Sequence, residues 1–204
     1  MLIEQPTFIL QRIYPKGIFR KDPSDHSVFL TFDDGPVPEV TPWLLDVLDE
    51  YGIKATFFVV GENVRKYPEL FRMIVERGHS VGNHTFNHVR GMRMRTPDYI
   101  DNVSKCDSLF HTRLFRPPHG ILRRWEYRYM LANGYDIVFY DVVTRDYSRK
   151  LDGKKVLENV RRYTRNGSII VFHDSLRSAE NLKYALPRAI GWLREQGYGF
   201  KTLG

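Results

Sequence analysis

The chain has 204 residues, of which 42 % are hydrophobic and 27 % are charged, so it can form one folded domain and is neither a disordered nor a membrane-embedded sequence. Its net charge of +7 is compatible with an anionic partner, and its single cysteine excludes an internal disulfide bond. The first residues, MLIEQP, contain no basic segment followed by a long apolar run. We therefore expect no secretion signal, no membrane span and a cytoplasmic location.

Apolar, β-prone runs alternate with segments of helical periodicity along the chain. The expected strands cover residues 27–32, 55–60, 79–82, 113–115, 137–142 and 168–172, with a weaker pattern at 199–203. The expected helices begin at Thr41 and Pro68 and then cover residues 97–109, 122–132, 154–164 and 180–196. Repeated strand–helix units predict an α/β fold with a parallel sheet, either a small, incomplete β/α barrel or an open doubly wound sheet.

The segment before the first expected strand differs from the rest of the chain. Residues 1–26 contain Pro6, Pro15 and Pro23, which favour an irregular backbone. We expect residues 1–26 to form an arm that packs across the barrel, and residues 27–204 to form the single domain.

Polar side chains that are unusual for a protein core follow five of the expected strands. They are Asp33 and Asp34 in TFDDGP, His84 and His88 in NHTFNH, Arg116 in FRPPHG, Asp146 in TRDYS, and His173 in IIVFHDS. In β/α folds the carboxyl ends of the strands form the functional face. We therefore expect these five stretches to meet at one rim of the barrel.

Two of these stretches together have the composition of a catalytic metal site. His84 and His88 are four residues apart, and on a helical turn both imidazoles would lie on one face. Either Asp33 or Asp34 can complete an Asp-His-His set with an open position for water, which leaves the other carboxylate free to act as a base. The alternative is a solvated histidine pair and an ordinary ion pair between an aspartate and Arg116.

The order and spacing of TFDDGP, HTFNH, RPPHG, RDY and VFH, between about residues 27 and 203, closely resemble the polysaccharide deacetylases, the NodB-like carbohydrate esterases. The resemblance implies a distorted, incomplete (β/α)7-type barrel with its active site at the C-terminal ends of the strands. It makes residues 27–204 a catalytic domain of this family. Members of the family remove acetyl groups from chitin, peptidoglycan or acetylated xylan.

The resemblance also implies a role for each motif residue. Asp34, His84 and His88 would bind a divalent metal, most often Zn²⁺ and alternatively Co²⁺. Asp33 would be the catalytic base with Arg116 as its tether. His173 would be the catalytic acid, oriented by Asp146. The family uses the backbone N–H at the position of His119 to bind the oxyanion.

Three motifs depart from the family pattern, at four positions, and leave the substrate open. Val143 and Tyr147 replace the first aspartate and the tryptophan of an Asp-x-x-Asp-Trp motif, and His119 stands where tyrosine is common. Val171 replaces a leucine that lines the acetyl pocket. We expect Tyr147 and Phe86 to stack on sugar rings, and the basic cluster at 145–155 to border the cleft.

These observations favour a metal-dependent hydrolase that removes N-acetyl groups from an amino-sugar glycan of the peptidoglycan or chitooligosaccharide type. One alternative is a deformylase or amidase that acts on a small molecule or a sugar nucleotide, which the lack of an export signal favours. Another is a glycan-binding protein without catalytic activity. Only the positive charge suggests a nucleic-acid partner, and because the sequence has no matching recognition motif we expect none.

Overall fold

The computed structural model describes residues 4–204, and its strands form one parallel sheet with the order β5-β4-β3-β2-β1-β7-β6, with β8 paired to the start of β1. The strands are β1 Ser27–Asp33, β2 Thr56–Val59, β3 Ser80–Asn83, β4 Leu114–Phe115, β5 Asp136–Ile137, β6 Val142–Val143, β7 Ile169–His173 and β8 Gly199–Phe200. The sheet curves without closing, which confirms the expected incomplete (β/α)7 barrel. Every residue of the central strand β1 is buried, as expected for a strand in the middle of a parallel sheet.

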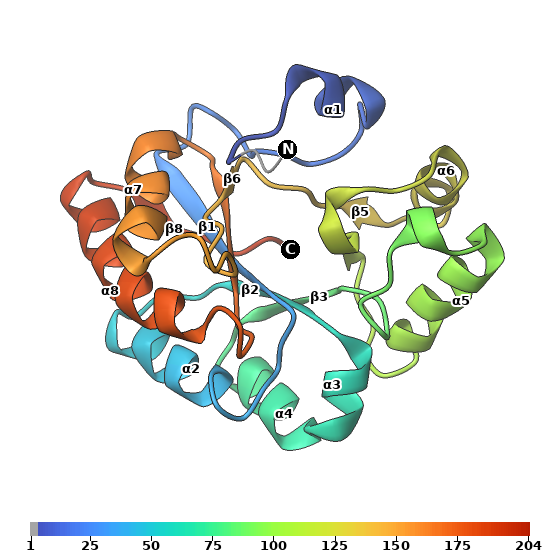
Figure 1. Cartoon of the computed structure of the whole chain (residues 1–204), viewed down its shortest axis with the longest axis horizontal. Helices are drawn as coiled ribbons and strands as arrows, with labels where there is room; N and C mark the ends of the chain where they lie inside the picture. The colour runs from blue at the N-terminus through green and yellow to red at the C-terminus, as the bar shows by residue number, and fades with distance from the viewer. Residues whose placement is uncertain (1–3) are drawn as a thin grey trace.

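The helices of the barrel lie around the outer side of the sheet, and one further short helix, α1, belongs to the N-terminal arm (Figure 1). They are α1 Phe8–Ile13, α2 Thr41–Glu50, α3 Gly61–Lys66, α4 Pro68–Glu76, α5 Thr96–Asp107, α6 Arg124–Ala132, α7 Gly153–Tyr163 and α8 Ala179–Glu195, with short 3₁₀ turns η1 Gly91–Arg93 and η2 Pro118–Gly120. The largest apolar cluster joins α2, α7 and α8 to β1, β2 and β7. In the part of the chain that is described, no helix is long and apolar enough to cross a membrane.

The expected strand at residues 137–142 was wrong, because this apolar run forms two short strands. β5 pairs with β4 and β6 pairs with β7, so the two strands lie at opposite ends of the sheet. Val138 and Phe139 between them are buried in the core without being part of either strand. An apolar run therefore indicated burial correctly here but not strand pairing.

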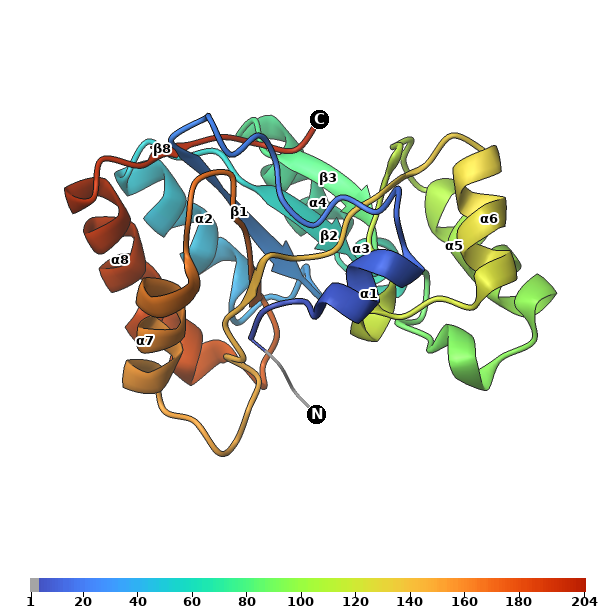
Figure 2. The same cartoon turned by 90° about the horizontal axis from the view of Figure 1, so that it is seen from above.

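The arm crosses the open side of the barrel between these two ends (Figure 2). Ile18 pairs with Val138 just after β5, and Arg20 pairs with Ser168 just before β7. The ring of Phe19 stacks on Phe139 with centroids 4.6 Å apart. The arm is not irregular throughout, since it contains α1, and its first three residues lie outside the described part of the chain.

Candidate active site

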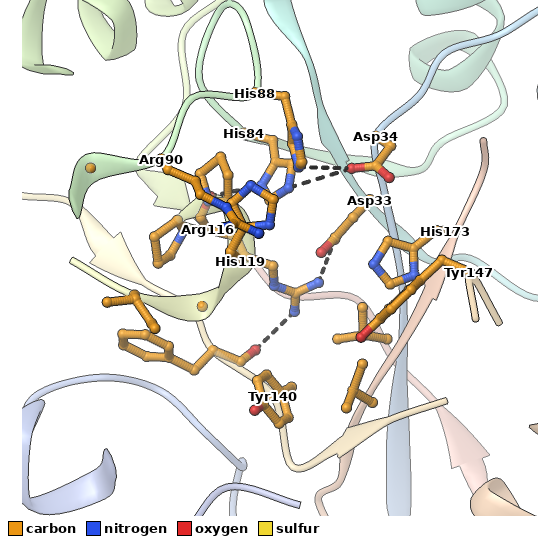
Figure 3. Close-up of a pocket in the computed structure, with 18 of the residues that line it drawn as sticks. Asp33, Asp34, His84, His88, Arg90, Arg116, His119, Tyr140, Tyr147 and His173 are labelled. Atoms are coloured by element: carbon orange, nitrogen blue, oxygen red, sulfur yellow. Dashed lines mark hydrogen bonds and ion pairs between the residues drawn. The ribbon is translucent and has the colours of Figure 1, made fainter. Parts of the chain in front are cut away.

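The two carboxylates of TFDDGP reach one cavity because the backbone leaves the strand geometry between them. Neighbouring side chains in a regular strand point to opposite faces. Asp33 is the last residue of β1, and Asp34 has a φ of 84°, in the left-handed region. This turn brings the second carboxylate to the same side as the first, and both line the same cavity (Figure 3).

A buried aspartate directly after the VFH motif holds this turn in place. Asp174 accepts hydrogen bonds from the backbone N–H of Gly35 at 3.0 Å and from the hydroxyl of Thr41 at 2.9 Å. Asn63 donates from its side-chain amide to the carbonyl of Asp34 at 2.8 Å. Burial raises the pKa of Asp174 to about 8, although both hydrogen bonds favour its charged form. The turn is thus anchored from β7, α2 and α3.

Replacing Gly35 with alanine is expected to destabilise the protein. A Cβ at this position would lie 1.9 Å from Oδ2 of Asp174, which is fully buried and fixed by its partners. Overpacking of this kind costs about 1–3 kcal/mol, so thermal unfolding of Gly35→Ala should begin several degrees earlier. Gly191→Ala is the matched control, because the same Cβ meets no atom within 4 Å inside α8 and should stabilise the protein slightly. Equal unfolding midpoints for the two variants would contradict the close packing of this turn.

The two histidines of HTFNH meet in a loop, and the helical turn considered from their spacing is not formed. Residues after β3 form an irregular segment in which Thr85 has a φ of 64° and His88 a φ of 52°. The carboxamide of Asn83 accepts the N–H of Thr85 at 2.7 Å, and Val89 donates its N–H to the hydroxyl of Thr85 at 3.2 Å. Left-handed backbone and these local hydrogen bonds bring the imidazoles together, with ring centroids 5.1 Å apart.

The histidines and Asp34 form a donor set that fits a divalent metal. Oδ1 of Asp34 lies 3.2 Å from Nε2 of His88 and 3.7 Å from Nε2 of His84, and the three ligand atoms all lie within 4.8 Å of one another. This carboxylate oxygen is buried and makes no hydrogen bond in the described part of the chain, although a buried carboxylate oxygen normally has a partner. A bound cation would supply that partner.

The protonation states also suit metal binding. Nδ1 of His84 faces the carbonyl of Arg116 at 2.8 Å and must carry the proton, so the lone pair of Nε2 points towards Asp34. Burial lowers the pKa of His84 to about 4, which keeps the imidazole neutral. Burial opposes the charge of Asp34, but the surrounding imidazoles, first that of His173, hold its pKa below the ordinary value. A charged carboxylate and neutral imidazoles are the forms that bind metals.

Asp33 is held by a buried arginine instead of facing the histidines. Nη1 of Arg116 donates to Oδ1 of Asp33 at 2.6 Å and to the hydroxyl of Thr31 at 2.7 Å, and Nη2 donates to the carbonyl of Phe139 at 3.0 Å. The guanidinium also lies 4.0 Å above the ring of Phe58. The side chains of Asp33 and Arg116 are 6 % and 4 % exposed, so their mutual attraction is weakly screened and the carboxylate is fixed in one orientation.

On the other side of the cavity, His173 is paired with Asp146. Nδ1 of His173 donates to Oδ1 of Asp146 at 2.8 Å, and the backbone N–H of His173 donates to Oδ2 at 2.7 Å. Burial opposes the charged imidazole, but the carboxylate of Asp146 outweighs it and raises the pKa of His173 to about 9. With Nδ1 engaged, Nε2 is left to exchange a proton within the cavity.

Six of the predicted site residues line one cavity of about 850 Å³, namely Asp33, Asp34, His84, His88, Arg116 and His173. The seventh, Asp146, is fully buried behind His173. Its wall also contains the four positions that depart from the family pattern, His119, Val143, Tyr147 and Val171. His119 has a φ of 63°, and its ring lies edge-on to that of His88 with centroids 4.8 Å apart. Val143 and Val171 are neighbours in the register of β6 and β7 and form an apolar patch.

Two expectations about the cleft were wrong. Phe86 is 2 % exposed and packs outside the cavity, with the ammonium of Lys105 4.1 Å from its ring centroid. The cations of the 145–155 cluster do not line the cavity among the described residues, and Arg145 pairs with Glu4 at 2.6 Å. Arg90, Arg93 and Arg177 line it instead, and Arg177 follows the VFH motif too far along the chain to have been noticed as part of it.

Comparison with known proteins agrees with this geometry. The sequence profile described as "Polysaccharide deacetylase" matches residues 20–138. A peptidoglycan-N-acetylglucosamine deacetylase of Bacillus cereus is 31 % identical over 183 residues, covering 86 % of the chain, and the chain spans 66 % of that relative's length. A chitooligosaccharide deacetylase of Bradyrhizobium sp. is 35 % identical over 161 residues, covering 76 % of the chain and 73 % of the relative.

Among solved structures, the Bc1960 peptidoglycan N-acetylglucosamine deacetylase superposes with a TM-score of 0.90 at 29 % identity. The superposition covers 97 % of this chain and 95 % of the other. The match therefore includes the arm as well as the barrel. The profile match and the relatives of 30 % identity or more, together with this superposition, show that the chain belongs to the polysaccharide deacetylase family.

Proposed function

We propose that the chain is a metal-dependent N-deacetylase of an amino-sugar glycan, of the peptidoglycan or chitooligosaccharide type. The observation that carries this proposal is the meeting of three units in one cavity: the Asp34, His84 and His88 donor set, the Asp33–Arg116 pair and the His173–Asp146 pair. The names of the relatives, which are deacetylases of peptidoglycan and of chitooligosaccharides, support the substrate class.

Each unit corresponds to one requirement of amide hydrolysis. A divalent ion held by Asp34, His84 and His88, Zn²⁺ or alternatively Co²⁺, would activate water and polarise the acyl oxygen. Asp33 accepts a proton from the attacking water, because Arg116 fixes one carboxylate oxygen and leaves the other to take the proton. His173 gives a proton from Nε2 to the leaving amine, which is a poor leaving group without one.

The remaining wall of the cavity suits an acetylated sugar. The turn at His119 supports the role of its backbone N–H as a donor to the oxyanion. The apolar patch of Val143 and Val171 suits the methyl group of an acetyl substituent. The ring of Tyr147, edge-on to His173 at 4.8 Å, offers a flat surface for a sugar ring.

Release of acetate from defined substrates tests the proposal. Purified protein with added Zn²⁺ or Co²⁺ is incubated with chitooligosaccharides, peptidoglycan fragments, acetylated xylan, an N-acetylated sugar nucleotide and an N-formylated amino sugar. We expect acetate from one of the amino-sugar glycans. Formate alone, or acetate from the sugar nucleotide alone, would instead support the deformylase or amidase alternative. No product from any substrate by metal-loaded protein would support a glycan-binding protein without activity.

The pairing of His173 with Asp146 predicts a pH dependence. The raised pKa keeps the imidazole in its acid form up to about pH 9, so the alkaline limb of the activity profile should lie near that value. Asp146→Asn removes the charge that raises the pKa and leaves the burial that lowers it, so the limb should move to lower pH by at least about one unit. The profile of kcat against pH is the measurement. Asp152→Asn, which only changes the cap of α7, is the control and should leave the limb in place. An unmoved limb in Asp146→Asn would assign the acid to another group.

A further inference from the structure

Helix α1 exposes most of its apolar side chains, whereas a surface helix usually buries them. Phe8, Ile9 and Ile13 are 74 %, 68 % and 57 % exposed, and none of the six residues of α1 is buried. Leu10 alone of its apolar residues is turned towards the domain, where it lines the active-site cavity. Surface helices normally place their apolar side chains against the core, so this exposed face indicates a binding surface.

Other exposed apolar side chains continue this face around the mouth of the cleft. We call the mouth surface the set of Phe8, Ile9 and Ile13 of α1, Met92 of η1, Ile121 after η2, and Trp125 of α6, which are between 47 % and 74 % exposed. Met92 and Ile121 line the cavity directly. The mouth surface therefore contains six of the ten large apolar side chains that are exposed in the described part of the chain.

Hydrogen bonds hold the segments of the mouth surface together. The hydroxyl of Tyr14, which follows α1, donates to the carbonyl of Leu122 at 2.6 Å and accepts the N–H of the same residue at 2.8 Å. The guanidinium of Arg123 donates to the carbonyl of Met92 at 3.0 Å. The apolar side chains are thus displayed from one connected rim.

The charge of this surface is mainly positive, although one of its cations, Arg95, pairs with Asp98 at 2.9 Å. The segments of the mouth surface, residues 7–16, 88–95 and 119–125, and the neighbouring segment 175–177, which lines the cavity, contain no aspartate or glutamate. They contain eight basic residues, Arg12, Lys16, Arg90, Arg93, Arg95, Arg123, Arg124 and Arg177. Exposed aliphatic and aromatic side chains among cations are the composition of surfaces that bind anionic membranes, where the apolar groups enter the headgroup region and the cations contact phosphates.

We propose that the mouth surface binds the surface of an anionic lipid bilayer. A second copy of the chain fits less well, because self-association through this face would bring two sets of eight cations together. A glycan strand also fits less well, because four of the six side chains, Ile9, Ile13, Met92 and Ile121, are aliphatic and present neither a flat ring nor a hydrogen-bonding group to a sugar.

Docking in this way turns the cleft towards the lipid headgroups. If the site is the deacetylase proposed above, its substrate class becomes an N-acylated amino sugar carried on a membrane lipid, presented to Asp33 and the metal ligands from the bilayer surface. This consequence rests on the proposed function, whereas binding to the bilayer does not.

Flotation with vesicles tests the docking without any measurement of catalysis. We expect the full chain to bind phosphatidylcholine vesicles that contain about one third phosphatidylglycerol, to bind pure phosphatidylcholine much less, and to dissociate as salt is raised. Phe8→Ser with Trp125→Ser should weaken binding at least about tenfold. The matched control is Val75→Ser with Leu109→Ser, which removes two exposed apolar side chains outside the mouth surface. Arg12→Glu should weaken binding by about tenfold, and Arg72→Glu on α4 should not.

The other occupants give different results. No binding to anionic vesicles, or binding that all four variants share equally with the unmodified chain, overturns the proposal. A dimer in solution that Phe8→Ser with Trp125→Ser converts to a monomer, without vesicle binding, assigns the surface to a second copy. The inactive variant Asp33→Asn should float as the unmodified chain does, so failure of the deacetylase proposal and failure of the docking proposal are distinguishable.

Discussion

Replacing His84 with alanine is expected to reduce kcat/KM by about 10³-fold or more, the largest effect that the geometry predicts. A metal-polarised water and acyl oxygen account for several kcal/mol of transition-state stabilisation, and each 1.4 kcal/mol corresponds to a tenfold change in rate. His84 is also the most constrained ligand, since it is buried and hydrogen-bonded to the carbonyl of Arg116. The measurements are acetate release and metal content by elemental analysis.

The surface histidine His26 gives the matched control for this variant. Its ring stacks on Tyr198 with centroids 4.4 Å apart and lies outside the cavity, so His26→Ala should keep both metal and activity. Removal of metal from the unmodified protein with a chelator should reproduce the loss, and added Zn²⁺ or Co²⁺ should restore activity. Full activity in metal-free protein would contradict the proposed mechanism.

Replacing Asp33 with asparagine is expected to lower kcat by about 10²–10⁴-fold while the protein keeps its metal. The carboxylate acts as the base in the proposed mechanism, and proton transfer by a positioned group contributes a factor of this size. The carboxamide oxygen of the substituted side chain can still accept the hydrogen bond of Arg116, so the loss should be chemical more than structural. The measurements are kcat, metal content and the unfolding midpoint of the same preparation.

The two variants distinguish the role of His84 as a metal ligand from the role of Asp33 as a base. His84→Ala should lose metal and activity together, whereas Asp33→Asn should lose activity alone. If Asp33→Asn also loses its metal, Asp33 is a ligand and the division of roles in TFDDGP is the reverse of the one proposed. If its kcat falls by less than about tenfold, another group is the base.

The convergence of the motifs could be predicted from sequence because it follows from topology. Asp33, His84, Arg116 and His173 each lie at or just after the end of a parallel strand, and parallel strands bring those ends to one edge. Short, buried runs between turns identified most of these strands. Predicting that these residues meet required only the order of strands and helices along the chain, and no knowledge of side-chain contacts.

The local backbone at the site could not be predicted in the same way. Within residues 4–204, the five residues other than glycine with positive φ are Asp34, Thr85, His88, His119 and Arg145, and each lies in or beside a motif of the site. Such conformations cost about 1–3 kcal/mol and persist only where the surrounding structure imposes them. Aspartate and histidine adopt positive φ more often than most side chains, but residue type does not say where they will do so, so the loop that brings His84 and His88 together could not be predicted.

The arm shows a second limit of sequence reasoning. The prolines of residues 1–26 indicated an irregular segment, yet Phe8–Ile13 forms a helix whose N-terminal Thr7 accepts the N–H of Leu10 at 3.2 Å. A short helix with exposed apolar residues has no periodicity that points to a core. Its position depends on Tyr14 and Phe19, which pack against Phe139 far along the chain.

The place of β1 in the sheet has a consequence for synthesis on the ribosome. This strand is translated early, but two of its three partners, β7 and β8, begin only at Ile169 and Gly199. The nascent polypeptide therefore holds a mostly apolar central strand that lacks its hydrogen-bond partner on one side until β7 has been translated. Strand pairing over such sequence distances is slow, and an unpaired strand edge is prone to aggregate. We therefore expect chaperones that act during translation to bind the nascent chain.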